Sequence, residues 1–133
     1  MNDVGHTAVA LRDAHFRLKR LARTWAEAGT VRGREPLGPA WQYSDLPDEA
    51  CYLDGQTLEL AGGLTLIAQL AVSFATTGTD MLASVTVEDD EGNVTELLST
   101  GPEEFPTTAA ELATEIDRCL TRMERLDLPP ALR

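Results

Sequence analysis

The chain has 133 residues, 43% of them hydrophobic, which is enough for one folded domain over 1–133 and excludes a wholly disordered chain. Eleven basic against twenty-two acidic residues give a net charge of −11, which argues against broad binding to nucleic acid or anionic lipid. No apolar run reaches the roughly 20 residues of a membrane span, and charges interrupt the first thirty residues, so we expect a cytoplasmic protein without membrane contact.

An amphipathic helix is predicted over residues 8–28. Its apolar residues recur at the spacing of one helical face, which includes Leu11, Leu18 and Trp25. The opposite face also carries Phe16, and its basic members are Arg12, Lys19, Arg20 and Arg23. This secondary basic patch either packs over an acidic sheet or holds a phosphate or a carboxylate-rich partner, and we favour packing.

Residues 30–50 are predicted to form a loop, because three prolines and a glycine between positions 36 and 47 disfavour regular structure. Within this loop, residues 41–43 are expected to form a short edge strand. Its two aromatic residues, Trp41 and Tyr43, either cap the core or anchor an interface.

The middle of the chain is predicted to form an antiparallel sheet. Residues 51–53 and 57–60 flank Asp54-Gly55, a dipeptide typical of tight turns. Segment 64–75 fits a strand, since apolar residues take every second position, and also fits a buried helix with a polar stripe of Thr65, Gln69 and Ser73. We favour the strand; a helix there would give an element order similar to that of the type III secretion chaperones.

The last elements complete an α+β fold. Residues 81–88 alternate between apolar and polar, and 94–99 can pair with them across the acidic turn 89–93. Thr108 and Glu111 form a capping-box pattern at the start of a helix that is expected to end near Asp127. The predicted fold is an N-terminal helix, an antiparallel meander of about five strands and a C-terminal helix, with both helices on one face of the sheet.

Residues typical of catalysis are scarce. His6 and His15 are nine positions apart, so they do not share a helical face, and a zinc site would have to recruit Cys51 and Cys119 from unrelated places. No serine lies in a G-x-S-x-G elbow, no glycine-rich phosphate loop occurs, and the acidic run 88–93 lacks the EF-hand register. We therefore expect no catalytic residue, no metal and no cofactor.

Charge is sorted along the chain. Residues 1–34 carry a net charge of +4 and residues 118–133 carry +2, whereas residues 35–117 carry −17 and contain no Lys or Arg. The basic ends either neutralise this acidic middle, or the acidic middle attracts a basic partner and accelerates its association. The predicted partner-binding residues are seven carboxylates and two aromatic residues: Glu88, Asp89, Asp90, Glu91, Glu96, Glu103, Glu104, Trp41 and Tyr43.

These features favour a small, acidic, non-enzymatic module that binds a basic partner protein. Immunity proteins, antitoxins and dedicated chaperones share its small size, its acidity and its lack of catalytic residues. One alternative is a small-ligand or enzymatic pocket between sheet and helices, holding His15 or Cys51 beside a carboxylate. A further alternative is a DNA mimic, whose carboxylates would be spaced like phosphates. The oligomeric state stays open, with a homodimer among the alternatives.

Overall fold

The computed structural model describes residues 3–28, 31–43, 47–129 and 132. Its elements in chain order are α1 (Asp3–Ala28), β1 (Gly33–Pro36), β2 (Ala40–Tyr43), β3 (Glu49–Glu59), the 3₁₀ turn η1 (Ala61–Gly63), β4 (Thr65–Ala75), β5 (Gly78–Glu88), β6 (Val94–Thr100) and α2 (Ala109–Glu124). The α+β class predicted from the sequence is confirmed.

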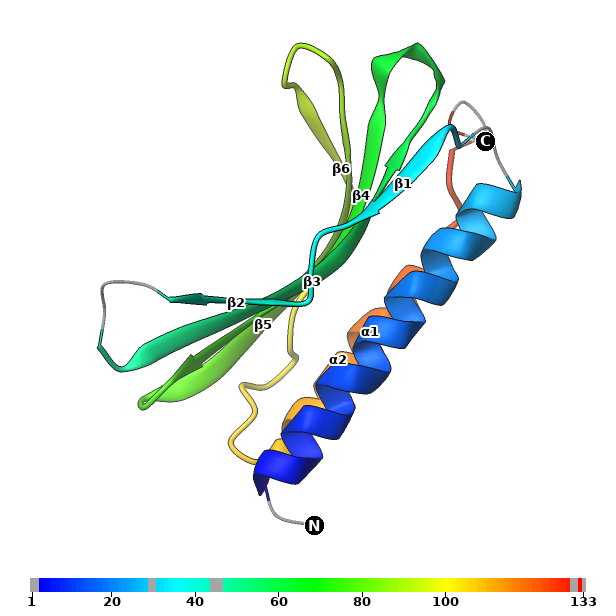
Figure 1. The fold of residues 1–133 in the computed structure, drawn as a ribbon. Coiled ribbons are helices and arrows are strands. Elements are labelled where there is room, and N and C mark those ends of the chain that lie inside the picture. Colours follow the sequence, from blue (N-terminus) through cyan, green and yellow to red (C-terminus); the bar gives the residue numbers. More distant parts are fainter. Residues whose placement is uncertain (1–2, 29–30, 44–46, 130–131, 133) are drawn as a thin grey trace.

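The molecule has two layers, a twisted sheet and a pair of helices on one of its faces (Figure 1). All strand pairs are antiparallel, in the order β1–β3–β4–β5–β6, with β2 also paired to β3. α1 contacts β3 and β4, α2 contacts β5, and the helices lie side by side with their N-terminal ends at the same end of the molecule (Figure 1). Packing of both helices on one face, as predicted, is therefore confirmed.

The core lies between these layers and is built from the predicted periodicities. α1 buries one face, from Leu11 to Trp25, and α2 buries the face that contains Ile116 and Cys119. β4 buries every second residue, which are Leu66, Ala68, Leu70 and Val72. The alternation of 64–75 therefore marks a strand, and the helical alternative, with its chaperone-like element order, is wrong.

The predicted tight turn at Asp54-Gly55 is wrong, because both residues lie in the middle of β3. Asp54 pairs with Leu70 and Gly55 with Gln69 in an unbroken ladder with β4. A Cβ on Gly55 would lie 2.5 Å from the carbonyl oxygen of Ala68, so glycine is needed here for close strand packing. Asp54 points into the core and is held by side-chain hydrogen bonds. The dipeptide thus serves packing and a buried polar contact, which its composition alone does not reveal.

The predicted loop over 30–50 contains two short edge strands: β2 confirms the edge strand predicted at 41–43, whereas β1 is not predicted from the sequence. β1 pairs with the last residues of β3, and β2 pairs with residues 50–53 of the same strand. Gly38 lies between them, where a Cβ would be 2.4 Å from the carbonyl oxygen of Leu53. Prolines thus interrupt this edge without preventing pairing, because β1 and β2 need only four residues each. Residue 30 and residues 44–46 of the predicted loop lie outside the described residues.

The C-terminal helix begins as predicted and ends earlier. Thr108 caps it by accepting a hydrogen bond from the Glu111 backbone N–H, and Glu111 accepts from Thr107 in return. In a capping box the glutamate accepts from the backbone N–H of the N-cap residue, whereas Glu111 accepts from that of the residue before it. The helix ends at Glu124, and Arg125 closes its last turn, so the predicted end near Asp127 is three residues too late.

Arg17 joins the two helices to each other. Its guanidinium lies 2.6 Å from Asp117 and 2.5 Å from Glu124, and it also donates to Thr121. The hydrogen bond to Glu124 contributes most to raising the pKa of Arg17, and the hydrogen bond to Asp117 contributes less. Because all three partners lie on α2, this one side chain fixes how the helices sit against each other.

We expect the substitution Arg17→Ala to lower the free energy of unfolding by about 1–3 kcal/mol, since charge-assisted hydrogen bonds are lost at a partly exposed site. Urea denaturation monitored by circular dichroism measures this value. Arg20→Ala, on the exposed side of the same helix, is the matched control and should change stability by about 0.5 kcal/mol or less. Equal effects of the two substitutions would contradict the role assigned to Arg17.

Candidate functional site

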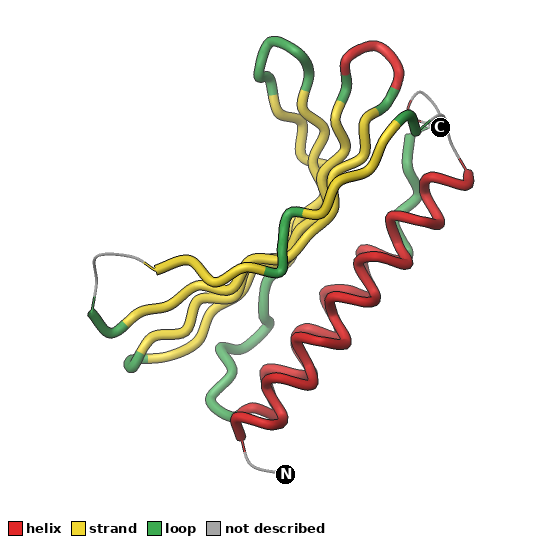
Figure 2. Tube along the Cα trace, in the orientation of Figure 1, coloured by secondary structure: helices red, strands yellow, loops and turns green. Residues whose placement is uncertain are grey.

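The sheet face opposite the helices is not covered by any described element (Figure 2). The two ends of the sheet bend away from the helices, so this outer face is concave (Figures 1 and 2). Its centre is formed by uncharged side chains such as Leu53, Ile67, Gln69 and Ala71, all of them half-buried. The curvature explains why residues without a covering layer are only partly exposed.

Carboxylates surround this uncharged centre. Strand register places six of them on the outer face, at strand ends or on edge strands: Glu35, Glu49, Glu59, Asp80, Glu88 and Glu96. We call these six residues the acidic rim. Glu35 and Glu96 lie at the two edges of the sheet, at opposite ends of one row of paired residues. The residues between them in this row are Thr57, Ile67 and Thr86. The only basic strand residue, Arg34, pairs with Leu58 and belongs to the helix-facing side.

Only part of the predicted partner-binding set belongs to this face. Glu88 and Glu96 are in the acidic rim, and Asp89, Asp90 and Glu91 form the adjoining β5–β6 turn. Hydrogen bonds from the side chain and backbone of Asn93 lower the pKa of Asp89, which also accepts from the Glu91 N–H. These hydrogen bonds within the turn hold its shape, and the turn continues the acidic surface next to the acidic rim.

The remaining predicted residues lie elsewhere. Glu103 and Glu104 follow β6 in the segment that leads to the start of α2, where Glu103 bonds to Glu115 through its backbone N–H. Trp41 and Tyr43 lie on β2, which pairs with residues 50–53 at the start of β3. This end of the sheet carries the β4–β5 turn, and the β5–β6 turn lies at the opposite end of the strands. The nine residues therefore do not form one site. The prediction grouped them because strand order cannot be derived from the local sequence.

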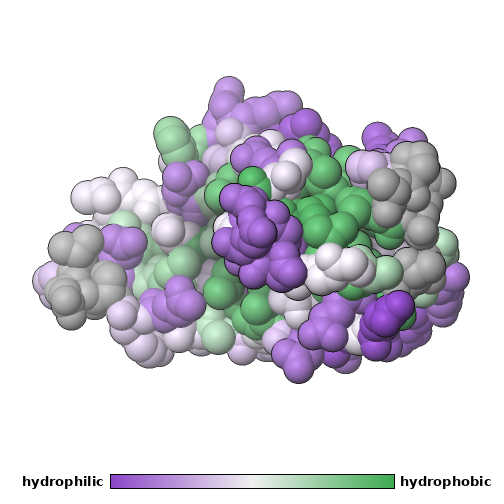
Figure 3. Space-filling model, turned by 90° about the horizontal axis from the view of Figure 1, so that it is seen from above, coloured by the Kyte–Doolittle hydropathy of each residue, from purple (hydrophilic) through white to green (hydrophobic). Residues whose placement is uncertain are grey.

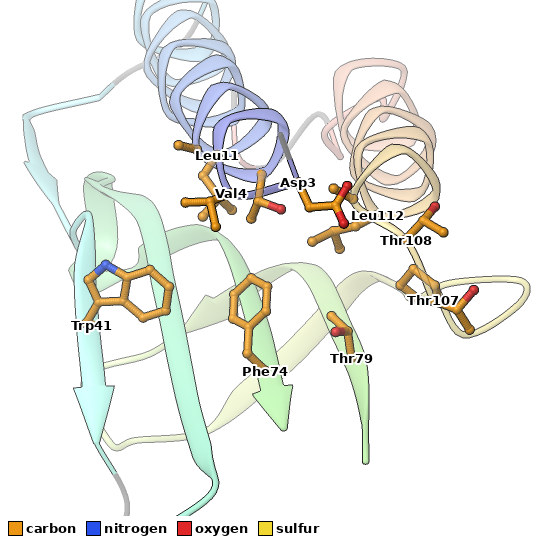
Figure 4. A pocket seen from close by; sticks show the side chains of 13 residues that line it. Asp3, Val4, Leu11, Trp41, Phe74, Thr79, Thr107, Thr108 and Leu112 are labelled. Carbon is orange, nitrogen blue, oxygen red and sulfur yellow. The ribbon is translucent and has the colours of Figure 1, made fainter. Parts of the chain in front are cut away.

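A pocket of about 470 Å³ opens between the sheet and the N-terminal ends of the two helices. Trp41 and Phe74 rise into it from the sheet, while Val4, Leu11 and Leu112 point toward them from the helices (Figure 4). The rings of Trp41 and Phe74 are 5.7 Å apart. The pocket exists because the sheet bends away from the helices here, leaving space that core side chains do not fill.

The opposite end of the molecule carries a smaller hollow, of about 200 Å³, at the C-terminal ends of the helices. Trp25, Leu60 and Leu128 are among its lining residues. Figure 3 looks onto this end and shows hydrophobic side chains gathered between hydrophilic ones, next to residues drawn in grey. Glu124 and Asp127 also line this hollow, and Glu124 is already bound to Arg17.

His15, Tyr52 and Asp54 form a buried polar cluster between α1 and β3. Asp54 is 0% exposed, and its Oδ2 lies 2.9 Å from His15 Nδ1 and 3.2 Å from the Tyr52 hydroxyl. Burial, together with the Asp54 carboxylate, raises the pKa of Tyr52. Among the described residues, His15 makes no hydrogen bond to a serine or cysteine, so the contact ties helix to sheet without presenting a nucleophile.

The secondary basic patch faces solvent. Arg12, Lys19, Arg20 and Arg23 are all exposed, so the expectation that they pack over the sheet is wrong. Phe16 lies among them, with the Arg12 guanidinium carbon 4.8 Å and the Lys19 Nζ 5.9 Å from its ring centre. These basic groups lie on the helix layer, away from the acidic rim, so the two charge patches do not neutralise each other by direct contact.

The described residues contain no cluster of three or more histidine, cysteine or acidic side chains able to hold a metal ion. Cys119 is buried, and burial raises the pKa of its thiol, which makes it a weak nucleophile. The larger pocket contains neither His15 nor Cys51, so the catalytic arrangement considered as an alternative is not found at its lining. Within the described part of the chain, no helix is long and apolar enough to span a membrane.

Comparison with known families, characterised proteins and solved structures finds no significant match for this chain.

Proposed function

We propose that this protein is a binding module for a basic partner protein, which it contacts through the concave outer face of the sheet. The single observation that supports this proposal is the arrangement of charge on that face. Six carboxylates surround an uncharged centre, and no Lys or Arg occurs among the strand residues of the face. Such an arrangement attracts a cationic surface while leaving an uncharged centre to be buried.

The charge distribution also supports a fixed orientation of the partner. The acidic rim and the β5–β6 turn lie on the sheet layer, whereas the exposed basic patch lies on the helix layer. A basic partner is thus attracted to one layer and repelled by the other. This steering accelerates association and depends on ionic strength. Inhibitors of the immunity or antitoxin type and dedicated chaperones are the classes of protein that work through such a contact.

Charge reversal tests the proposal directly. We expect the double substitution Glu88→Lys and Glu96→Lys to weaken binding of an extended peptide of alternating lysine and valine by about tenfold or more at low salt, because attraction becomes repulsion. Fluorescence anisotropy at several salt concentrations measures both the affinity and its salt dependence, which should also flatten. Asp89 is left unchanged in this test because its carboxylate holds the turn.

Glu27→Lys, an exposed reversal on α1, is the matched control and should leave peptide binding within about twofold of the parent protein. A peptide in which glutamate replaces lysine should not bind. The proposal fails if the double variant binds the basic peptide as tightly and with the same salt dependence as the parent protein.

A further inference from the structure

We propose that the pocket between the sheet and the N-terminal ends of α1 and α2 binds a small amphipathic amine, a molecule with an aromatic or aliphatic body and one ammonium group. This site is separate from the acidic rim and does not depend on the proposed partner protein. Its volume, about 470 Å³, lies within the range of ligand pockets.

The walls of the pocket suit an apolar body. Trp41 and Phe74 present two aromatic rings, and Leu11 and Leu112 close the opposite side (Figure 4). Trp41 is 49% exposed and Val4 is 78% exposed, so large apolar surface stays in contact with water at the mouth. A ligand that covers these groups gains the free energy of their removal from water. Thr79, which lines the pocket from β5, offers a hydroxyl as a polar contact that can orient a ligand.

The charge at the pocket favours a cation over an anion. Among the described residues that line the pocket, Asp3 alone is charged, and its carboxylate lies beside the pocket at the start of α1 (Figure 4). Helix N-termini by themselves attract anions, but Asp3 and Glu111 in the first turns of the two helices offset that partial charge. Aromatic faces also attract ammonium groups. An ammonium at the mouth can therefore contact Asp3 and stay partly hydrated while the apolar body enters the pocket.

Three probes that share a naphthalene body test this inference: 1-naphthylmethylamine, 1-naphthylmethanol and 1-naphthoate. We expect the amine to bind several-fold more tightly than the alcohol, and the carboxylate to bind most weakly. The chain has two tryptophans, so its NMR spectrum contains two indole N–H signals, and only that of Trp41 should shift on titration. A Trp25→Phe variant assigns the two signals.

Two variants separate the charge from the cavity. Asp3→Asn should remove the preference for the amine while leaving the alcohol's affinity unchanged, and Asp13→Asn, exposed on the same helix, should change neither. Thr79→Phe fills the pocket from β5 and should abolish binding of both probes. Equal or tighter binding of the carboxylate, absence of binding by every probe, or a shift at Trp25 alone would overturn the proposal. A Trp41 signal that moves on dilution of the protein alone would assign the pocket to a second copy of the chain instead.

Discussion

The substitution Asp54→Ala is expected to lower the free energy of unfolding by about 3 kcal/mol or more, because a fully buried carboxylate is removed from its partners. The Tyr52 hydroxyl, the Gly55 backbone N–H and His15 Nδ1 lie within 3.2 Å of its oxygens. Truncation leaves these groups without their partner inside the protein, and each buried donor left unpaired costs roughly 1–3 kcal/mol. Urea denaturation at neutral pH measures the change.

Asp13→Ala is the matched control for this experiment, since Asp13 is exposed on α1, the helix that Asp54 holds through His15. Its effect on the free energy of unfolding should stay within about 0.5 kcal/mol. Tyr52→Phe removes one of the three contacts and should give an intermediate loss. If Asp54→Ala unfolded at the same urea concentration as Asp13→Ala, the buried cluster would not be the tie between α1 and β3 that its geometry indicates.

Leu70→Ala is expected to lower the free energy of unfolding by about 2–5 kcal/mol, the usual range for truncation of a buried leucine. Leu70 is 0% exposed, in the middle of β4 and on the helix-facing side of the sheet. Removing three carbons there leaves a cavity that the paired strands on either side cannot close. Urea denaturation with the same probe as above gives the value.

Leu82→Ala is the matched control, because it is the same substitution on the adjacent strand and on the opposite face of the sheet. Leu82 is 47% exposed, so its truncation should cost less than about 1 kcal/mol. The ratio of the two losses reports which face of the sheet the helices cover. Similar losses would contradict the two-layer arrangement with an uncovered outer face.

Most of the fold can be predicted from the spacing of apolar residues along the chain. The apolar arcs of both helices and the alternation along β4 and β5 each specify one buried face, and the structure buries those residues. The turn predicted at Asp54-Gly55 is wrong because the same two residue types occur both in turns and in buried strands. What distinguishes the two cases is a partner from α1, His15, and a close approach of β4, and neither is a property of the local sequence.

The proposed binding face is only partly predictable from the sequence, because its residues come together through strand pairing. The alternation along 81–88 indicates that Glu88 shares a face with Ser84 and Thr86, and the structure extends this face to Asp80. Glu35, Glu49 and Glu59 join it only through the pairing of β1, β3 and β4, which depends on register over the whole sheet. The sequence predicts only that Trp41 either caps the core or anchors an interface, because its neighbours in the pocket, Phe74 and Asp3, come from distant elements.

Mapping where a basic ligand binds can test the claim that the outer sheet face receives a basic partner. We predict that titration with the lysine–valine peptide shifts the backbone NMR signals of Ile67, Ala71 and Leu82 on the outer face, and leaves those of exposed α1 residues such as Arg20 unchanged. Shifts confined to the helix layer, or no shifts at low salt, would contradict the claim.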